Sequence, residues 1–78
     1  MAMRDLVEFL ARALVDEPEA VKVEEIEENG DIVLEITVAE DDVGRVIGRS
    51  GRIANAIRTL AKAAAVREDR RVIVDILD

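Results

Sequence analysis

The segment Gly48-Arg49-Ser50-Gly51 combines residue types that can hold a phosphate group. Because glycine has no Cβ, the backbone there can turn sharply and approach a ligand, and free N–H groups opening a following helix point at phosphate oxygens. Arg49 adds a cation and Ser50 a hydroxyl donor. Two glycines three residues apart are common, however, and a glycine that only ends a helix is the alternative explanation.

Positive charge is concentrated around this segment, although the chain as a whole is acidic. The net charge is −7 and the pI about 4.5, which on average disfavours nucleic-acid binding, since Lys and Arg drive it. Residues 43–67 nevertheless contain no acidic residue and six basic ones, Arg45, Arg49, Arg52, Arg58, Lys62 and Arg67. The other residues comprise five basic and eighteen acidic ones, a net −13. This distribution favours a basic binding surface on an acidic body over a helix face that is basic only for solubility.

Several classes of site are excluded by residue types that the chain lacks. It has no cysteine and no histidine, which excludes disulfides, zinc and iron–sulfur sites, and Ser-His or Cys-His nucleophiles. Phe9 is its single aromatic residue, so bases cannot stack on an aromatic platform. The paired acids Asp41 and Asp42 have no histidine, cysteine or tyrosine to act with, and we expect no enzyme, metal or cofactor. The absence of a long apolar stretch predicts a cytoplasmic protein with no membrane partner.

Two elements that must support the segment precede it. Apolar residues at helical spacing predict an amphipathic helix over residues 3–15, with Phe9 in its core face and Pro18 ending it. A strand from Val21 changes its alternation at Ile26, which predicts a bulge or a frayed end. Asn29-Gly30 then predicts a type I′ hairpin turn into a strand over residues 32–38.

Two helices flank the segment, and a strand closes the chain. Glu40-Asp41-Asp42 opens a short helix, where the acids complement the helix dipole. The second helix runs from Ser50 or Arg52 to Val66, with Ser50 as a candidate cap. A strand over residues 72–76 completes the order α-β-β-α-α-β. Residues 1–78 are therefore predicted to form one α+β domain, a three-stranded sheet with helices packed on one face.

This arrangement resembles a known family of nucleic-acid-binding domains. Val46-Ile47-Gly48-Arg49-Ser50-Gly51, placed between two helices after a hairpin, resembles the KH domain, whose GxxG loop clamps about four nucleotides. The element order is similar to the type II KH arrangement. From residues 5–8 through 47–59 to 72–76 the chain resembles the small bacterial KH proteins of the KhpA (YlqC) family. Ala54 departs from the general KH pattern, in which a bulky aliphatic residue is usual.

The resemblance implies binding of single-stranded RNA without catalysis. It further implies a homodimer or a heterodimer with a KhpB/Jag-type KH protein, and a role as RNA chaperone or post-transcriptional regulator linked to cell elongation and division. The residues expected to bind RNA are Arg45, Val46, Ile47, Gly48, Arg49, Ser50, Gly51, Arg52 and Ile53. Among them Val46, Ile47 and Ile53 can line the groove floor or belong to the core.

The helix after the loop contains more alanine than one buried stripe needs. Because small residues let helices approach closely, Ala54, Ala61 and Ala65 are expected to meet another subunit, unless alanine serves only helix propensity. Arg58 and Lys62, one turn apart, are candidate rim residues or ion-pair partners in that dimer. An alternative function follows, a protein-interaction adaptor that pairs with another KH domain and binds little RNA.

Overall fold

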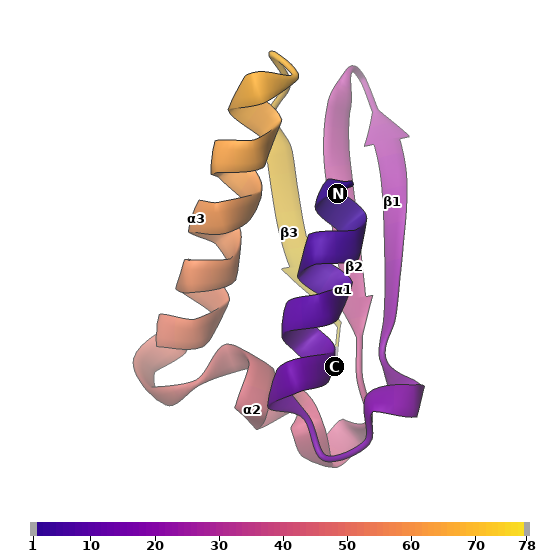
Figure 1. The fold of residues 1–78 in the computed structure, drawn as a ribbon, viewed down its shortest axis with the longest axis vertical. Coiled ribbons are helices and arrows are strands. Elements are labelled where there is room, and N and C mark those ends of the chain that lie inside the picture. The colour runs from indigo at the N-terminus through magenta and orange to yellow at the C-terminus, as the bar shows by residue number, and fades with distance from the viewer. Residues whose placement is uncertain (1, 78) are drawn as a thin grey trace.

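The computed structural model describes residues 2–77 and has the predicted order of elements. Two helices and two strands precede the third helix and the closing strand: α1 (Met3–Leu14), β1 (Lys22–Glu28), β2 (Asp31–Thr37), α2 (Val43–Ile47), α3 (Arg52–Arg67) and β3 (Val72–Ile76). Short 3-10 turns occupy Pro18–Ala20, Glu40–Asp42 and Arg49–Gly51. Figure 1 shows α1 and α3 side by side on one face of a three-stranded sheet, as the sequence predicts.

The sheet has the order β1-β2-β3, with β1 antiparallel and β3 parallel to the central strand β2. Asn29 and Gly30 form the predicted two-residue turn, with φ values of 53° and 85°, and Glu28 pairs with Asp31 across it. The parallel pairing requires the long crossover through α2 and α3. The helical hairpin that carries the GxxG loop is therefore an intrinsic part of the sheet's topology.

The prediction of a bulge or a frayed end at Ile26 is wrong. The register of β1 with β2 runs without interruption from the Lys22–Thr37 pair to the Glu28–Asp31 pair. Val23 is buried on the helical face, whereas Ile26 has the opposite parity and lies half-buried on the outer face. The apolar alternation changes parity in the sequence because β1 places one apolar residue, Val23, on its inner face and another, Ile26, on its outer face. Such a strand can stay regular without the extra residue of a bulge.

The core lies between the sheet and the two long helices. The central strand contributes its fully buried side chains, Ile32, Leu34 and Ile36. On the helical side of the core, α1 contributes Val7 and Ala11, and α3 contributes Ile57 and two alanines, Ala61 and Ala65. Alanine on the buried side of α3 allows the helix backbone to lie close to the sheet. Among residues 2–77, no helix has both the length and the apolar character that a membrane crossing requires.

Phe9 lies outside the core, contrary to expectation, with 64% of its surface exposed. The buried positions of α1 are Met3, Val7 and Ala11, a stripe at i, i+4 and i+8 that faces the sheet. Phe9 is two residues from both Val7 and Ala11, a rotation of about 200° around the helix, and so it points away from them. Its helical spacing from Leu6 placed it on a flank of the helix and not on the covered face.

Candidate nucleic-acid interface

The GxxG segment is a tight turn with three residues at positive φ. Gly48 has φ 76° and ψ 172°, Ser50 has φ 56° and ψ 26°, and Gly51 has φ 75° and ψ 14°. The Gly48 N–H donates to the Gly44 carbonyl (2.9 Å), and the Gly51 N–H donates to the Gly48 carbonyl (3.1 Å). Ser50 makes no capping hydrogen bond, and Gly51 is the N-cap of α3, so the expected Ser50 cap is absent.

The two glycines are required for different reasons. A Cβ on Gly48 would lie 2.6 Å from Ile53 Cγ1, inside any allowed contact, and its φ and ψ fall in a region that only glycine adopts readily. A Cβ on Gly51 would meet only Asn55 Nδ2 at 3.9 Å, so its backbone is open on that side. Gly48 therefore serves packing within the chain, whereas Gly51 is favoured by its left-handed φ of 75° and leaves the backbone there open.

Replacing each glycine by alanine should separate these two roles. Gly48→Ala is expected to lower the free energy of unfolding by about 2–4 kcal/mol, because it adds the clash with Ile53 to the backbone strain. Gly51→Ala carries only the left-handed strain, about 1–2 kcal/mol. Urea unfolding of both variants and of Gly48→Ala combined with Ile53→Ala measures this. Failure of Ile53→Ala to recover part of the Gly48→Ala loss would contradict the proposed clash.

Four cations near the loop lack a carboxylate partner among residues 2–77. Arg49 and Arg52 are exposed within the loop and at the first position of α3, and Lys62 is exposed further along that helix. Arg58 is half-buried and donates to Asn55 Oδ1 at 3.3 Å, a neutral partner. The N–H groups that open α3 have no side-chain cap either. Positive potential is therefore uncompensated from the loop to Lys62.

Arg45 differs from these four, because its guanidinium is held within the fold. Its Nη2 lies 3.0 Å from Asp16 Oδ2, and its Nη1 lies 3.2 Å from Asp42 Oδ1. Asp42 is only 1% exposed and accepts hydrogen bonds from the backbone N–H groups of Asp16 and Glu17, both at 3.1 Å. Asp42 thus joins the segment after α1 to the start of α2, a tertiary role that its position in an acidic run did not reveal.

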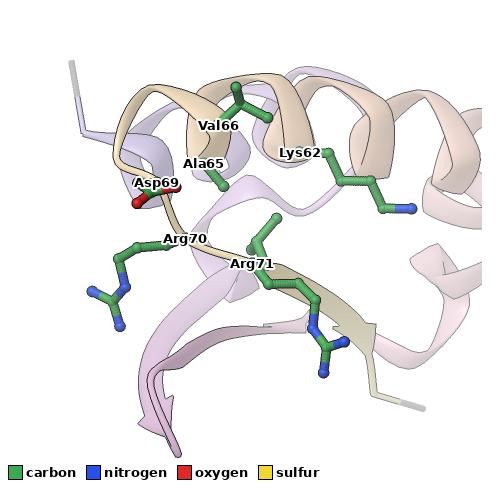
Figure 2. Close-up of a pocket in the computed structure, with 7 residues that line it drawn as sticks. Lys62, Ala65, Val66, Asp69, Arg70 and Arg71 are labelled. Carbon is green, nitrogen blue, oxygen red and sulfur yellow. The ribbon is translucent and has the colours of Figure 1, made fainter.

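A groove between α3 and the edge strand β3 continues from the basic surface. Arg58 and Lys62 line it from α3, and Arg71, Ile73 and Val74 from the strand side. Next to it lies a pocket of about 390 Å³ that shares Lys62 and Arg71 with the groove and is also lined by Asp69 and Arg70 of the turn before β3 (Figure 2). We did not foresee these two arginines, although their position directly before the closing strand was a usable signal.

The charge of Arg70 and Arg71 is compensated, unlike that of Lys62. Arg70 Nη1 lies 3.3 Å from Glu27 Oε1, and the same guanidinium donates to the Gly30 carbonyl. Arg71 Nη2 lies 2.9 Å from Asp31 Oδ2. Both arginines therefore tie the turn before β3 to the β1–β2 hairpin. The unpaired cations that line this groove therefore end at Lys62, whereas Arg67, further along α3, also has no ion pair among residues 2–77 but lines a different pocket with Met3 and Leu6 of α1.

The aliphatic residues around the loop occupy three different environments. Val46 is fully buried in the core, and Ile47 is exposed beside the loop. Ile53 is half-buried, packs against the core and lies under Gly48. Of these three residues, Ile47 is the one that is exposed to solvent.

The structure corrects the expected dimer strip. Ala54, Ala61 and Ala65 are all buried within the single chain, because they form the side of α3 that faces the sheet. The large exposed apolar residues of α1 and α3 are instead Phe9, Leu60 and Val66. Arg58 and Lys62, assigned to the same interface, line the groove beside β3.

Comparison with known proteins gives consistent matches along the chain. The family model described as KhpA/KhpB, KH domain, matches residues 4–76. The RNA-binding protein KhpA of Caldanaerobacter subterraneus subsp. tengcongensis is 56% identical over 75 residues, which cover 96% of this chain and 100% of that protein. The RNA-binding protein KhpA of Clostridium perfringens is 51% identical over the same coverage of both chains.

A solved structure is similar in fold at lower identity. The crystal structure of Aquifex aeolicus Era bound to GDP·AlF4⁻ superposes with a TM-score of 0.67 and 22% identity, over 95% of this chain and 29% of the Era chain. At this identity the likeness concerns the fold alone.

Proposed function

The chain belongs to the KhpA/KhpB KH-domain family, and we propose that it binds single-stranded RNA by clamping the sugar–phosphate backbone at residues 48–51. The observation that carries the proposal is the open backbone at Gly51, bordered by Arg49 and Arg52, neither of which has an ion pair among residues 2–77. Relatives named RNA-binding protein KhpA, similar over nearly the whole chain, support it. The family is one of RNA-binding KH proteins and not of enzymes, and we assign no catalytic step.

The residues in and around the loop have distinct parts in the proposed clamp. Arg49 pairs with a phosphate, and the uncapped N–H groups that open α3 donate to phosphate oxygens. Arg52, Arg58 and Lys62 guide the strand along α3, with Ile47 beside the loop as the aliphatic contact. Arg45 acts indirectly, since its pairs with Asp16 and Asp42 position α2.

The dependence of RNA affinity on salt tests this electrostatic picture. Four uncompensated cations, each contributing about 0.7 to the slope for a single strand, give a slope of log K against log salt of about −2 to −3. Fluorescence polarisation with a labelled oligonucleotide between low and moderate salt measures it. A slope near zero would show that phosphate contacts do not drive binding.

We also propose that the protein acts as a dimer. A single site with at most four phosphate contacts and no stacking residue binds loosely, and a second linked site makes the next contact intramolecular. We assign the interface to the surface of α1 and α3, which contact each other. Phe9 of α1 and Leu60 of α3 are both exposed, and 46% of the surface of Leu60 is accessible. Two large apolar side chains on adjoining helices suit burial against a second KH domain.

Changing Leu60 to glutamate should separate the subunits. We expect the molar mass by light scattering to fall from twice 8.6 kDa to 8.6 kDa, because a charge would be buried in the interface. Thr59→Glu, an exposed neighbour on α3, introduces the same charge and serves as the matched control. A Leu60→Glu protein that keeps the dimer mass would rule out this surface.

The same surface favours a second candidate function, an adaptor for another KH domain. In this alternative the partner is a KhpB/Jag-type protein, and RNA is bound chiefly by the partner. Retained RNA binding in the monomeric Leu60→Glu variant would favour the RNA clamp, and loss of partner capture with no direct RNA binding would favour the adaptor. For either function we propose a cytoplasmic setting and a role in RNA chaperoning or post-transcriptional control linked to cell elongation and division.

A further inference from the structure

Figure 1 shows that α1 and α3 leave the outer face of the sheet uncovered, and the strand register places a row of aliphatic side chains on that face. The register places Ile26 beside Val33 and Val33 beside Ile73, so that the row crosses all three strands. Ile26 and Val33 are half-buried by their neighbours, and Ile73 is 45% exposed. Within residues 2–77 no other element packs over this row. The residue that broke the alternation of β1 in the sequence, Ile26, is part of it.

A row of carboxylates lies directly beside the aliphatic row. Glu24, Glu35 and Asp75 are neighbours in the register and share the face of Ile26, Val33 and Ile73. Lys22 Nζ lies 3.3 Å from Glu24 Oε1, whereas Glu35 and Asp75 have no ion pair among residues 2–77. Like charges opposite each other destabilise a sheet. The fold therefore carries a repulsion here that a basic partner would relieve.

We propose that this outer sheet face docks a segment of another protein that presents lysine or arginine next to aliphatic side chains. The charge of Glu35 and Asp75 is complementary to such a segment and repels phosphate, in RNA and in anionic lipids alike. A partner with cations alone would leave the row of Ile26, Val33 and Ile73 in water.

This site is separate from the proposed RNA clamp. The loop at residues 48–51 connects α2 to α3 in the helical layer, whereas the docking face is on the other side of the sheet (Figure 1). The clamp loop and the docking face therefore do not overlap, and they approach each other only at the edge strand β3, where Ile73 also borders the groove beside α3. Docking of the partner does not depend on whether the loop binds RNA.

Two blocked pentapeptides test the proposal, Lys-Leu-Lys-Leu-Lys and the equally charged Lys-Ser-Lys-Ser-Lys. Each is titrated at low salt into the full ¹⁵N-labelled chain and followed by two-dimensional NMR. We expect the leucine peptide to shift the amide signals of Ile26, Val33, Glu35, Ile73 and Asp75. Its affinity should exceed that of the serine peptide at least about tenfold, because only leucine covers the aliphatic row.

Two paired variants separate the charge contribution from the apolar one. Glu35→Gln with Asp75→Asn should weaken both peptides by at least about tenfold, and Val33→Thr with Ile73→Thr should remove the difference between the peptides. All four positions are on the uncovered face, and threonine favours strands, so the fold is retained and unchanged core signals verify it. As a control, Arg49→Asp with Ser50→Asp in the loop should leave peptide binding unchanged.

Three results would overturn the proposal. Equal affinity of the leucine and serine peptides would mean that charge alone attracts them. Shifts confined to other acidic parts of the chain would place the contact elsewhere. Concentration-dependent shifts of the Val33 and Ile73 signals without peptide would mean that a second copy of this chain covers the face. If the unmodified protein binds no RNA, the proposed clamp is contradicted, but the proposed docking face is not.

Discussion

Replacing Arg49 and Ser50 by aspartate is expected to raise the Kd for single-stranded RNA at least about 30-fold, which corresponds to about 2 kcal/mol. The change removes the cation at the tip of the loop and places two carboxylates where the phosphates would lie. The melting temperature should stay within a few degrees of the parent. Arg49 is exposed, and Ser50 has left-handed φ and ψ values that aspartate tolerates better than most residues.

A matched control separates contact from overall charge. Val66→Asp with Arg67→Asp also changes the charge by three units, on exposed positions near the far end of α3. Because the Debye length at physiological salt is about 8 Å, this control should weaken RNA binding only slightly. Binding is measured by fluorescence polarisation and stability by thermal melting. If the loop variant binds as tightly as the parent, or if the control loses as much affinity as the loop variant, the clamp is not at residues 48–51.

Replacing Asp42 by alanine should be among the most destabilising single changes in this protein. Its carboxylate accepts the N–H groups of Asp16 and Glu17 and pairs with Arg45, while being 1% exposed. Removal leaves two backbone donors and a guanidinium without their acceptor, which costs about 2–4 kcal/mol. For a domain of this size that is a fall in melting temperature of about 10–20 °C.

The neighbouring acid provides the control for Asp42. Asp41→Ala removes an exposed carboxylate from the same 3-10 turn and should change stability by less than about 0.5 kcal/mol. Asp42→Asn keeps one acceptor oxygen and is expected to lose about half as much as Asp42→Ala. Urea unfolding of the three variants compares them. Similar losses for Asp41→Ala and Asp42→Ala would mean that net acidity, and not the buried hydrogen bonds, accounts for the effect.

Local features of the fold could be predicted because each depends on neighbours in the sequence. Asn29-Gly30 forms the expected turn, since these two residues tolerate positive φ better than others. Pro18 follows the end of α1, and the alternation of Ile32, Leu34 and Ile36 identified the buried face of β2. The GxxG loop between two helices was predicted in the same way, from glycines bounded by helical spacing.

The errors share a different cause. Phe9 and the alanines of α3 were placed on the wrong face, and the change of parity at Ile26 was interpreted as a bulge or a frayed end, although the elements themselves were predicted correctly. Helical or strand spacing identifies which residues share a face, but it cannot say which face another element covers. Ala61 and Ala65 are small enough to suit either a subunit contact or a closely packed core, and packing against the sheet decided between them.

The order of elements, the turn residues and the location of positive charge between residues 43 and 67 could be predicted without a structure, because propensity and charge are properties of adjacent residues. Which of those charges are free of an ion pair depends on the folded arrangement of the chain. Asp16 and Asp42 come to Arg45 from separate parts of the chain, and Glu27 and Asp31 compensate Arg70 and Arg71, which are 40 or more residues away. Ion pairing depends on distance in space, so the basic surface from Arg49 to Lys62 was defined by the fold.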